Sequence, residues 1–290
     1  KVYPNGSADI NHFQAAGGTG LLFGELIKAG LMHGDAAVCF GGTLETACIE
    51  PFLEEGGLRW RPAADQSLDP EVIRPASSAF HPEGGIRLLE GNLGRSLIKT
   101  SAVAPERQSM TAPAVVISNQ EELKVLFERG ELDRDCVVVA RFQGPAANGM
   151  PELHQLMPIL GVLQDRGHAV ALVTDGRLSG ASGKVPAAIH VTPEAAKGGP
   201  IGRIQDGDVI SLDVASGELF VRLDDQRLGD RPHPDTPTAK NTVGRGLFKF
   251  SREVVTDAES GGCTLFEPLV IEDLPQAEFA RNVAFEHCAS

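Results

Sequence analysis

The middle of the chain alternates strand and helix patterns, and this alternation limits the possible folds more than any other feature. Apolar runs rich in β-branched residues lie at 112–118, 135–142 and 168–174, and turn-forming residues bound them. Helical patterns at 119–130 and 151–167 fill the intervals between these runs. Because helices that join consecutive strands act as crossover connections, we predict a sheet that is at least partly parallel.

Residues 207–223 follow a different pattern, in which apolar and polar residues alternate around a turn at Ser216-Gly217. This pattern predicts an antiparallel hairpin. Strands of both kinds in one unit favour an α/β fold, built as a mixed β-barrel with helices against it.

Shifts in residue pattern divide the chain into three predicted parts. Residues 1–80 are helical and loop-rich, and the stretch at 74–85, which carries Pro and Gly, is the best candidate for a linker. We predict the barrel domain over 81–235. The remaining residues form a polar tail, 236–290, with two predicted short helices, around 246–255 and 276–285.

Charge and cysteine usage exclude several classes of protein. A net charge of −13 argues against a binder of the nucleic-acid backbone, which needs a basic face. No apolar run approaches the roughly 18 to 20 residues that span a bilayer. No signal peptide is visible at the KVYPNGS start. The five cysteines contain no C-x-x-C pair, and their odd number favours free thiols in a reducing compartment, so we expect a cytoplasmic protein.

Two segments, 141–158 and 171–195, pass from an apolar strand into a glycine-rich loop and carry the polar residues best suited to chemistry. Glu152 in the first segment lies where the first turn of a helix is predicted, and the helix dipole stabilises a carboxylate there. The same carboxylate beside a glycine-rich loop also suits a hard cation such as Mg²⁺. The residues alone leave both interpretations open.

The second segment places Ser179 in the sequence GRLSG, which lacks the G-x-S-x-G spacing of a nucleophile elbow. Ser179 either fills a tight glycine turn or acts as a hydroxyl that loses its proton beside positive charge. Asp175, Arg177 and Lys184 are candidate substrate-binding residues, although Asp175 could instead cap the turn after the strand. Further on, Thr192-Pro193-Glu194 predicts an N-cap with Pro at the first helical position.

Four stretches of the sequence together resemble the dihydroxy-acid and 6-phosphogluconate dehydratase family. They read PNGSADINHFQAAGG, GNLGRSLIKTSAV, GPAANGMPELHQLMP and TDGRLSGASGKVPAAIHVTPEA, and they lie between residues 4 and 210. The likeness is to the C-terminal half of the family. Within it, ANGMPELH and SGASGKVPAAIHVTPEA are closer to the 6-phosphogluconate branch than to the branch that serves branched-chain amino acids.

The resemblance implies a lyase with an iron–sulfur cluster, expected to be 4Fe-4S, and Mg²⁺. Such a lyase removes water from a 2,3-dihydroxy acid, here 6-phospho-D-gluconate, to give 2-keto-3-deoxy-6-phosphogluconate in the Entner-Doudoroff pathway. By the same likeness Glu152 is a Mg²⁺ ligand and Ser179 is the base that takes the proton from carbon 2, while cluster iron acts on the departing 3-hydroxyl. The implied fold is a swivelling β/β/α barrel that covers the cluster site, with residues 1–80 as the helical end of the N-terminal cluster-binding domain. The full-length enzyme is expected to be a homodimer.

The chain departs from the family pattern in two respects. None of its cysteines matches the cluster motif, so the cluster ligands and the other Mg²⁺ ligands are expected in an N-terminal half outside this sequence, and the chain alone is expected to be inactive. Ala146 also stands where a basic residue is expected. Two alternatives remain: another dihydroxy-acid or sugar-acid dehydratase, and a stand-alone binding module without catalysis.

Overall fold

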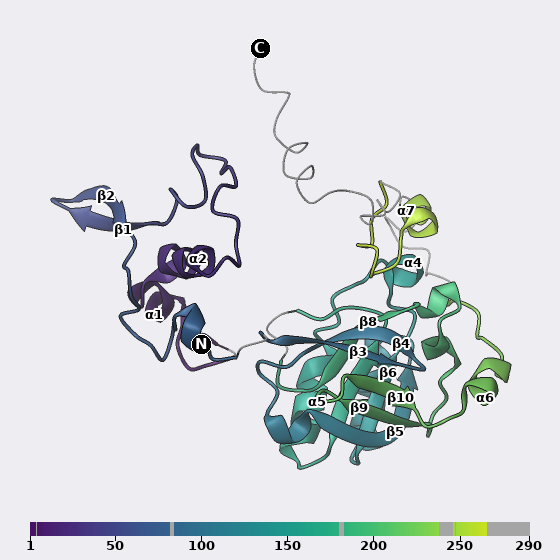
Figure 1. The fold of residues 1–290 in the computed structure, drawn as a ribbon. Coiled ribbons are helices and arrows are strands. Elements are labelled where there is room, and N and C mark those ends of the chain that lie inside the picture. Colours follow the sequence, from purple (N-terminus) through teal and green to yellow (C-terminus); the bar gives the residue numbers. More distant parts are fainter. Residues whose placement is uncertain (4, 82–83, 180–182, 238–245, 247, 266–290) are drawn as a thin grey trace. The chain divides into compact units, whose positions relative to one another are not determined.

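The computed structural model describes residues 1–3, 5–81, 84–179, 183–237, 246 and 248–265. The chain forms two compact units, whose strands and helices are labelled in Figure 1. The first unit comprises Lys1–Arg87, Ile98–Gln108 and Ser179–Pro186, and the second comprises Leu88–Leu97, Ser109–Leu178 and Ala187–Ser290. The predicted three-part division at residues 80 and 235 stays a prediction.

The first unit contains the predicted helical segment and one unpredicted hairpin. Two helices, α1 (Ile10–Ala15) and α2 (Gly18–Lys28), are separated at Gly17, whose φ of 130° a residue with a side chain rarely adopts. Strands β1 (Ile49–Glu54) and β2 (Gly57–Pro62) then pair antiparallel, with most side chains exposed. A strand without a buried face shows no clear apolar alternation, so this hairpin left little trace in the sequence pattern.

Strands β3 to β10 close a barrel in the order β10-β3-β4-β8-β7-β6-β5-β9 (Figure 1). Their bounds are β3 Ile86–Gly91, β4 Gly94–Lys99, β5 Ser109–Ile117, β6 Cys136–Ala140, β7 Val170–Thr174, β8 Ala187–Thr192, β9 Val209–Asp213 and β10 Glu218–Val221. The α/β class and the mixed barrel predicted from the sequence are therefore confirmed. Strands β3, β4 and β8 were not predicted, because glycine or polar residues interrupt their short apolar patterns.

Four neighbouring strands of the barrel, β5 to β8, run parallel; the crossover pattern predicted this for β5, β6 and β7, and the unpredicted β8 continues it. The pairs Ile117↔Ala140 and Ala140↔Thr174 show that β5, β6 and β7 end at the same level. The predicted hairpin is also confirmed, with β9 pairing antiparallel to β10 and to β5. The carboxyl ends of the parallel strands therefore meet at one edge of the barrel.

The described helices are short and several cover the outside of the barrel. They are α3 (Gln120–Glu128), α4 (Pro145–Asn148), α5 (Leu156–Asp165), α6 (Asp225–Asp230) and α7 (Lys249–Val254), with 3₁₀ turns at Ala76–Ser78, Pro105–Arg107, Ala195–Lys197 and Pro200–Arg203. In Figure 1, α7 lies beside α4, and these two helices are in contact. The first predicted tail helix is thus confirmed, and the second, at 276–285, lies outside the described residues.

Helices α3 and α5 contact each other and contribute fully buried leucines to the core, namely Leu123, Leu160 and Leu163. Strands β6 and β7 are buried along their whole length, because one face lines the barrel interior and the other is covered. Burial on both faces explains their continuous apolar sequences. Among the described residues, no helix has the length and apolar character needed to span a bilayer.

Candidate functional site

The loops that follow β6, β7 and β8 bring the predicted polar residues of the second unit to one edge of the barrel. The loop after β6 carries Glu152, and the loop after β7 carries Asp175 and Arg177. The loop after β8 carries Glu194, to which the sequence had given only a role at a helix start. Ligand sites in parallel sheets form at the carboxyl ends of the strands, which makes this edge the candidate site.

Glu152 and Arg177 lie side by side where these loops meet. The two residues form an isolated parallel β-bridge, and the Arg177 Nη1 is 3.0 Å from Oε2 of Glu152. The Arg177 Nε also donates to the carbonyl of Met150 at 2.8 Å. The Glu152 side chain is 33% exposed, so this carboxylate is fixed by Arg177 and still accessible to a ligand.

A second set of contacts fixes the Glu152 backbone from α3. The Gln120 side-chain amide donates to the carbonyl of Glu152 at 3.3 Å, and the Gln155 N–H donates back to the Gln120 Oε1 at 3.1 Å. Upstream, Gly149 (φ 71°) and Met150 (φ 51°) turn the chain through left-handed conformations. Glu152 is thus held between two elements rather than on a free loop.

The prediction that Glu152 lies in the first turn of a helix is wrong. Helix α5 begins at Leu156, and the N–H of Leu153 donates to the carbonyl of Arg177 at 3.4 Å instead of to a carbonyl of its own segment. That pairing with a neighbouring loop keeps 151–153 extended. A helix dipole therefore does not stabilise the Glu152 carboxylate, so this alternative to a ligand role is excluded.

Asp175 is fully buried at the end of β7, and its carboxylate accepts three backbone N–H groups. Phe142, Gln143 and Ala195 donate to it at 3.1, 2.8 and 3.0 Å. Burial, with a smaller contribution from the nearby Glu194 carboxylate, raises the pKa of Asp175 to about 6 against the opposing effect of these hydrogen bonds. The residue is a junction between loops, so its burial favours a structural link over direct contact with substrate.

Glu194 is the functional candidate that sequence reasoning missed. Its side chain is buried, and its two oxygens accept the N–H groups of Ala146 and Ala147 at 2.9 and 3.1 Å, in the first turn of α4. The predicted N-cap at Thr192-Pro193 is wrong, because Thr192 ends β8 and the next turn starts at Ala195. The only available signal was a carboxylate directly after a strand, which is too common to single out.

Ser179 and Lys184 belong to the first unit, and residues 180–182 between them lie outside the described residues. Ser179 is half-buried and Lys184 is exposed. Ser179 follows Arg177 by two positions, and chain geometry keeps their Cα atoms within about 7 Å. The roles predicted for both residues stay predictions.

Potential metal ligands are sparse in the described part of the chain. It contains no group of three or more His, Cys, Asp or Glu side chains that could hold a metal ion. Among its cysteines, Cys39, Cys48 and Cys136 are free thiols, and burial raises the pKa of the Cys136 thiol to about 11. Glu152 can thus provide one oxygen ligand, whereas these thiols do not assemble a cluster site.

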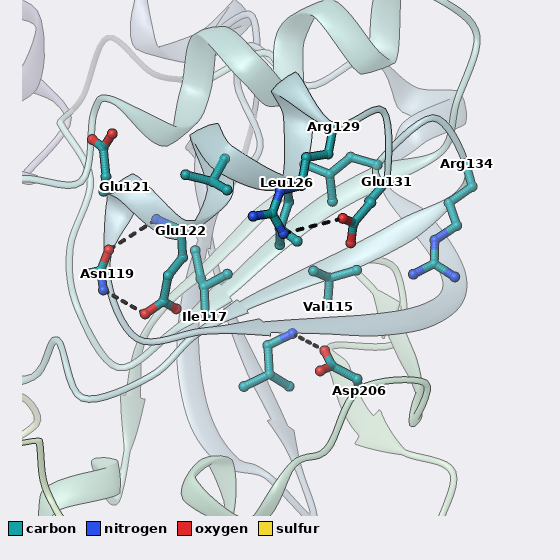
Figure 2. A pocket seen from close by; sticks show the side chains of 13 residues that line it. Val115, Ile117, Asn119, Glu121, Glu122, Leu126, Arg129, Glu131, Arg134 and Asp206 are labelled. Atoms are coloured by element: carbon teal, nitrogen blue, oxygen red, sulfur yellow. Dashed lines mark hydrogen bonds and ion pairs between the residues drawn. The ribbon is translucent and has the colours of Figure 1, made fainter.

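A cavity of about 760 Å³ lies between α3 and β5, away from the residues predicted for the site (Figure 2). Its carboxylates are engaged in local contacts: Glu122 accepts the Ser118 N–H and the Asn119 side-chain amide, and Asp206 accepts the Val116 N–H at 2.7 Å. These carboxylates cap a helix and a strand edge. The cavity is therefore not the candidate site.

Comparison with known proteins agrees with the resemblance drawn from the motifs. The sequence model of the family described as dihydroxy-acid/6-phosphogluconate dehydratase C-terminal matches residues 71–262. A phosphogluconate dehydratase of Pseudomonas aeruginosa is 54% identical over 270 residues, which are 93% of this chain and 44% of that protein. A phosphogluconate dehydratase of Escherichia coli strain K12 is 54% identical over 92% of this chain and 45% of its own length.

A more distant relative is a dihydroxy-acid dehydratase of Ignicoccus hospitalis, 33% identical over 90% of this chain and 45% of that protein. The chain spans less than half the length of the curated relatives that it matches. From the family match and these identities, the chain belongs to the dihydroxy-acid/6-phosphogluconate dehydratase family, of which it represents the C-terminal half.

Proposed function

We propose that the chain is the C-terminal half of a phosphogluconate dehydratase. The complete enzyme would convert 6-phospho-D-gluconate into 2-keto-3-deoxy-6-phosphogluconate and water in the Entner-Doudoroff pathway. The observation that carries this proposal is 54% identity to proteins of that name across almost the whole chain, against 33% to a dihydroxy-acid dehydratase. The position of Glu152 at the strand-end edge supports it independently.

Glu152 is the proposed Mg²⁺ ligand of this half. Its carboxylate is an oxygen donor of the kind that Mg²⁺ prefers, it is partly exposed, and Arg177 and Gln120 hold it in place. Bound Mg²⁺ would supply a Lewis acid that holds the substrate carboxylate and acidifies the proton on carbon 2. The remaining Mg²⁺ ligands would come from other parts of the full-length protein.

Ser179 is the proposed base. In its deprotonated form the Ser179 oxygen takes the proton from carbon 2, and the electrons of the C2–H bond form the carbon–carbon double bond as the 3-hydroxyl leaves. The serine then returns this proton to the departing hydroxide, which leaves as water, and the resulting enol rearranges to the 2-keto acid. A serine can do this only beside positive charge that favours loss of its own proton. Arg177, two positions earlier in the chain, and Lys184 are the proposed sources of that charge and the proposed contacts for anionic groups of the substrate.

The iron–sulfur cluster of the family does not fit the cysteines in the described part of the chain, because no three potential ligands gather there. We assign its ligands to the rest of the full-length protein. Free thiols are typical of a reducing compartment, which supports the cytoplasm as the site of action. The homodimer expected from the family remains a prediction.

The test is a substrate panel on the full-length protein, with formation of 2-keto acid as the readout. We expect turnover of 6-phosphogluconate at least tenfold faster, per enzyme and at equal concentration, than turnover of gluconate or of a branched-chain 2,3-dihydroxy acid. Equal or faster turnover of either competitor would reassign the substrate. The chain 1–290 alone is expected to be inactive, and turnover by it would contradict the assignment of the missing ligands.

Two variants test the residues, each with a matched control. Glu152→Gln should weaken Mg²⁺ binding in a titration, while Glu128→Gln, at the exposed end of α3, should not. Ser179→Ala should abolish turnover and retain Mg²⁺ binding, while Ser216→Ala, at the exposed β9–β10 turn, should retain both. Undiminished turnover by Ser179→Ala would remove the serine from the mechanism.

A further inference from the structure

Two carboxylates are buried at the candidate site without a cation to pair with them. Asp175 and Glu194 are 0% and 2% exposed, and they are the buried acidic residues of the described chain. Among the residues described, no Lys or Arg lies within ion-pair distance of either one. Burying a carboxylate without a cation is costly, so such residues need another reason to be there.

Their hydrogen bonds all lead to the backbone of neighbouring loops. Asp175, at the end of β7, accepts N–H groups from Phe142 and Gln143 after β6 and from Ala195 after β8. Glu194, after β8, accepts N–H groups of Ala146 and Ala147 after β6. The two side chains therefore tie three loops together through five backbone hydrogen bonds, a set of contacts that we name the carboxylate clasp.

The clasp includes a backbone conformation that needs support. Phe142 has a φ of 61°, which is unfavourable for a residue with a side chain, and in this conformation the N–H groups of Phe142 and Gln143 both reach one carboxylate. Gly144 is held close to the same clasp, because a Cβ there would lie 2.4 Å from Oε2 of Glu194. The segment 142–147 is thus fitted tightly to the two acidic side chains.

The clasped segment leads directly to the proposed metal ligand. Residues 142–147 precede the turn at Gly149 and Met150, and Glu152 follows that turn. On the other side, Arg177 is two positions after Asp175 and holds the carboxylate of Glu152 at 3.0 Å. Both members of the Glu152–Arg177 pair are therefore connected to Asp175 by a few residues of chain.

We propose that Asp175 and Glu194 are positioning residues of the dehydration site, holding Glu152 and Arg177 in register through the carboxylate clasp. This inference rests on the function proposed above. Charge serves this purpose because an ionised acceptor makes stronger hydrogen bonds to backbone N–H groups than a neutral one, and inside the protein no water competes for them. Neither residue touches substrate in this assignment.

The test compares Asp175→Asn and Glu194→Gln with Asp213→Asn in the full-length protein. Asp213 is a matched control because it also accepts two backbone N–H groups at a strand end, those of Ala215 and Ser216, on the opposite edge of the barrel. The substituted Asn or Gln keeps the shape of the acidic side chain. Its NH₂ group, however, faces an N–H donor of the clasp and cannot accept that hydrogen bond.

The first readout is hydrogen exchange of the peptide 141–155, which does not depend on catalysis. We expect exchange in this peptide to accelerate at least tenfold in Asp175→Asn and Glu194→Gln, and to stay unchanged in Asp213→Asn. If Asp175→Asn does not fold, Glu194→Gln alone decides the matter. Unchanged exchange in a folded clasp variant would overturn the proposal.

The second readout is the Mg²⁺ dissociation constant together with kcat and KM. Misplacement of a catalytic group by about 1 Å costs on the order of 100-fold, so we expect a 10- to 100-fold loss in kcat and weaker Mg²⁺ binding, with KM nearly constant. Equal losses in the Asp213→Asn control would show a general stability effect and overturn the positioning role. If the wild type shows no dehydratase activity, the proposed function fails, whereas accelerated exchange would still support the clasp.

Discussion

The buried carboxylate of Asp175 should make the stability of the barrel depend on pH in an unusual direction. Burial raises its pKa from an ordinary value of 3.8 to about 6, although three backbone N–H groups act in the opposite direction. The folded protein therefore binds this proton more tightly than the unfolded chain does. As the pH falls through the folded pKa, this group adds to the free energy of unfolding, and the full gain is present below the unfolded pKa.

The size of the effect follows from the two pKa values. Each pKa unit corresponds to about 1.4 kcal/mol, so lowering the pH from about 8 to about 4.5 should increase the contribution of Asp175 by about 2 kcal/mol. Other carboxylates change stability over the same range. Their effects cancel when the wild type is compared with Asp175→Asn at each pH, because the variant retains every other titrating group.

The assay is urea unfolding of the wild type and Asp175→Asn at both pH values, followed by pulsed hydrogen exchange of peptides from β6 and β7. These strands report the barrel, whereas the single tryptophan, Trp60, lies in the first unit. We expect the difference in unfolding free energy between the two proteins to widen by about 2 kcal/mol at the lower pH. If this difference in unfolding free energy stays constant or shrinks, the three N–H groups lower the pKa of Asp175 by at least as much as burial raises it. That result would refute this reasoning.

Three further substitutions test the barrel itself. Leu160→Ala removes a fully buried side chain from α5 and should lower the unfolding free energy by about 2–5 kcal/mol in the same urea assay. Gly91→Ala would place a Cβ 1.9 Å from the carbonyl oxygen of Leu219, so the β3–β10 seam should open and the melting temperature should fall, and an unchanged melting temperature would contradict this contact. Asp208→Asn breaks a bidentate pair with Arg231, only 10–20% exposed, and should cost about 2–4 kcal/mol at neutral pH. Because the Arg231 hydrogen bonds hold the pKa of Asp208 below its usual value despite burial, this contribution is lost as the pH falls through that lowered pKa, so the cost measured by urea unfolding should shrink in acid.

Local signals predicted much of the barrel correctly. Asn119 accepts the N–H of Glu122 at the start of α3, as a sequence with a capping residue before an amphipathic run predicts. The crossover pattern and the Ser216-Gly217 turn predicted the parallel and antiparallel pairs. These features depend on residues that are close in the chain, so their physical cause is contained in the sequence window that predicts them.

The site was only partly predictable for the opposite reason. Glu152 was expected in a helix by its position after Pro151, yet the chain there is extended because Leu153 bonds to Arg177 on another loop. The role of Glu194 was missed for the same reason, since its N–H partners at Ala146 and Ala147 belong to the loop after a different strand. The residues that surround either carboxylate in the sequence include none of these partners.

The amino-acid sequence by itself determined the alternation β5-α3-β6-α5-β7, the β9–β10 hairpin, the family, and the residue types available at the ends of β6 and β7. Only the tertiary structure decided that Asp175 and Glu194 turn inward to backbone N–H groups while Glu152 remains partly open and paired with Arg177. The physical reason is that burial and hydrogen-bond partners depend on which strands lie side by side in the closed barrel. Strand pairing brings distant segments together, and the groups that it places beside a carboxylate decide its role. Asp175 and Glu194 meet backbone N–H groups and hold loops, whereas Glu152 stays partly exposed and can bind a metal ion.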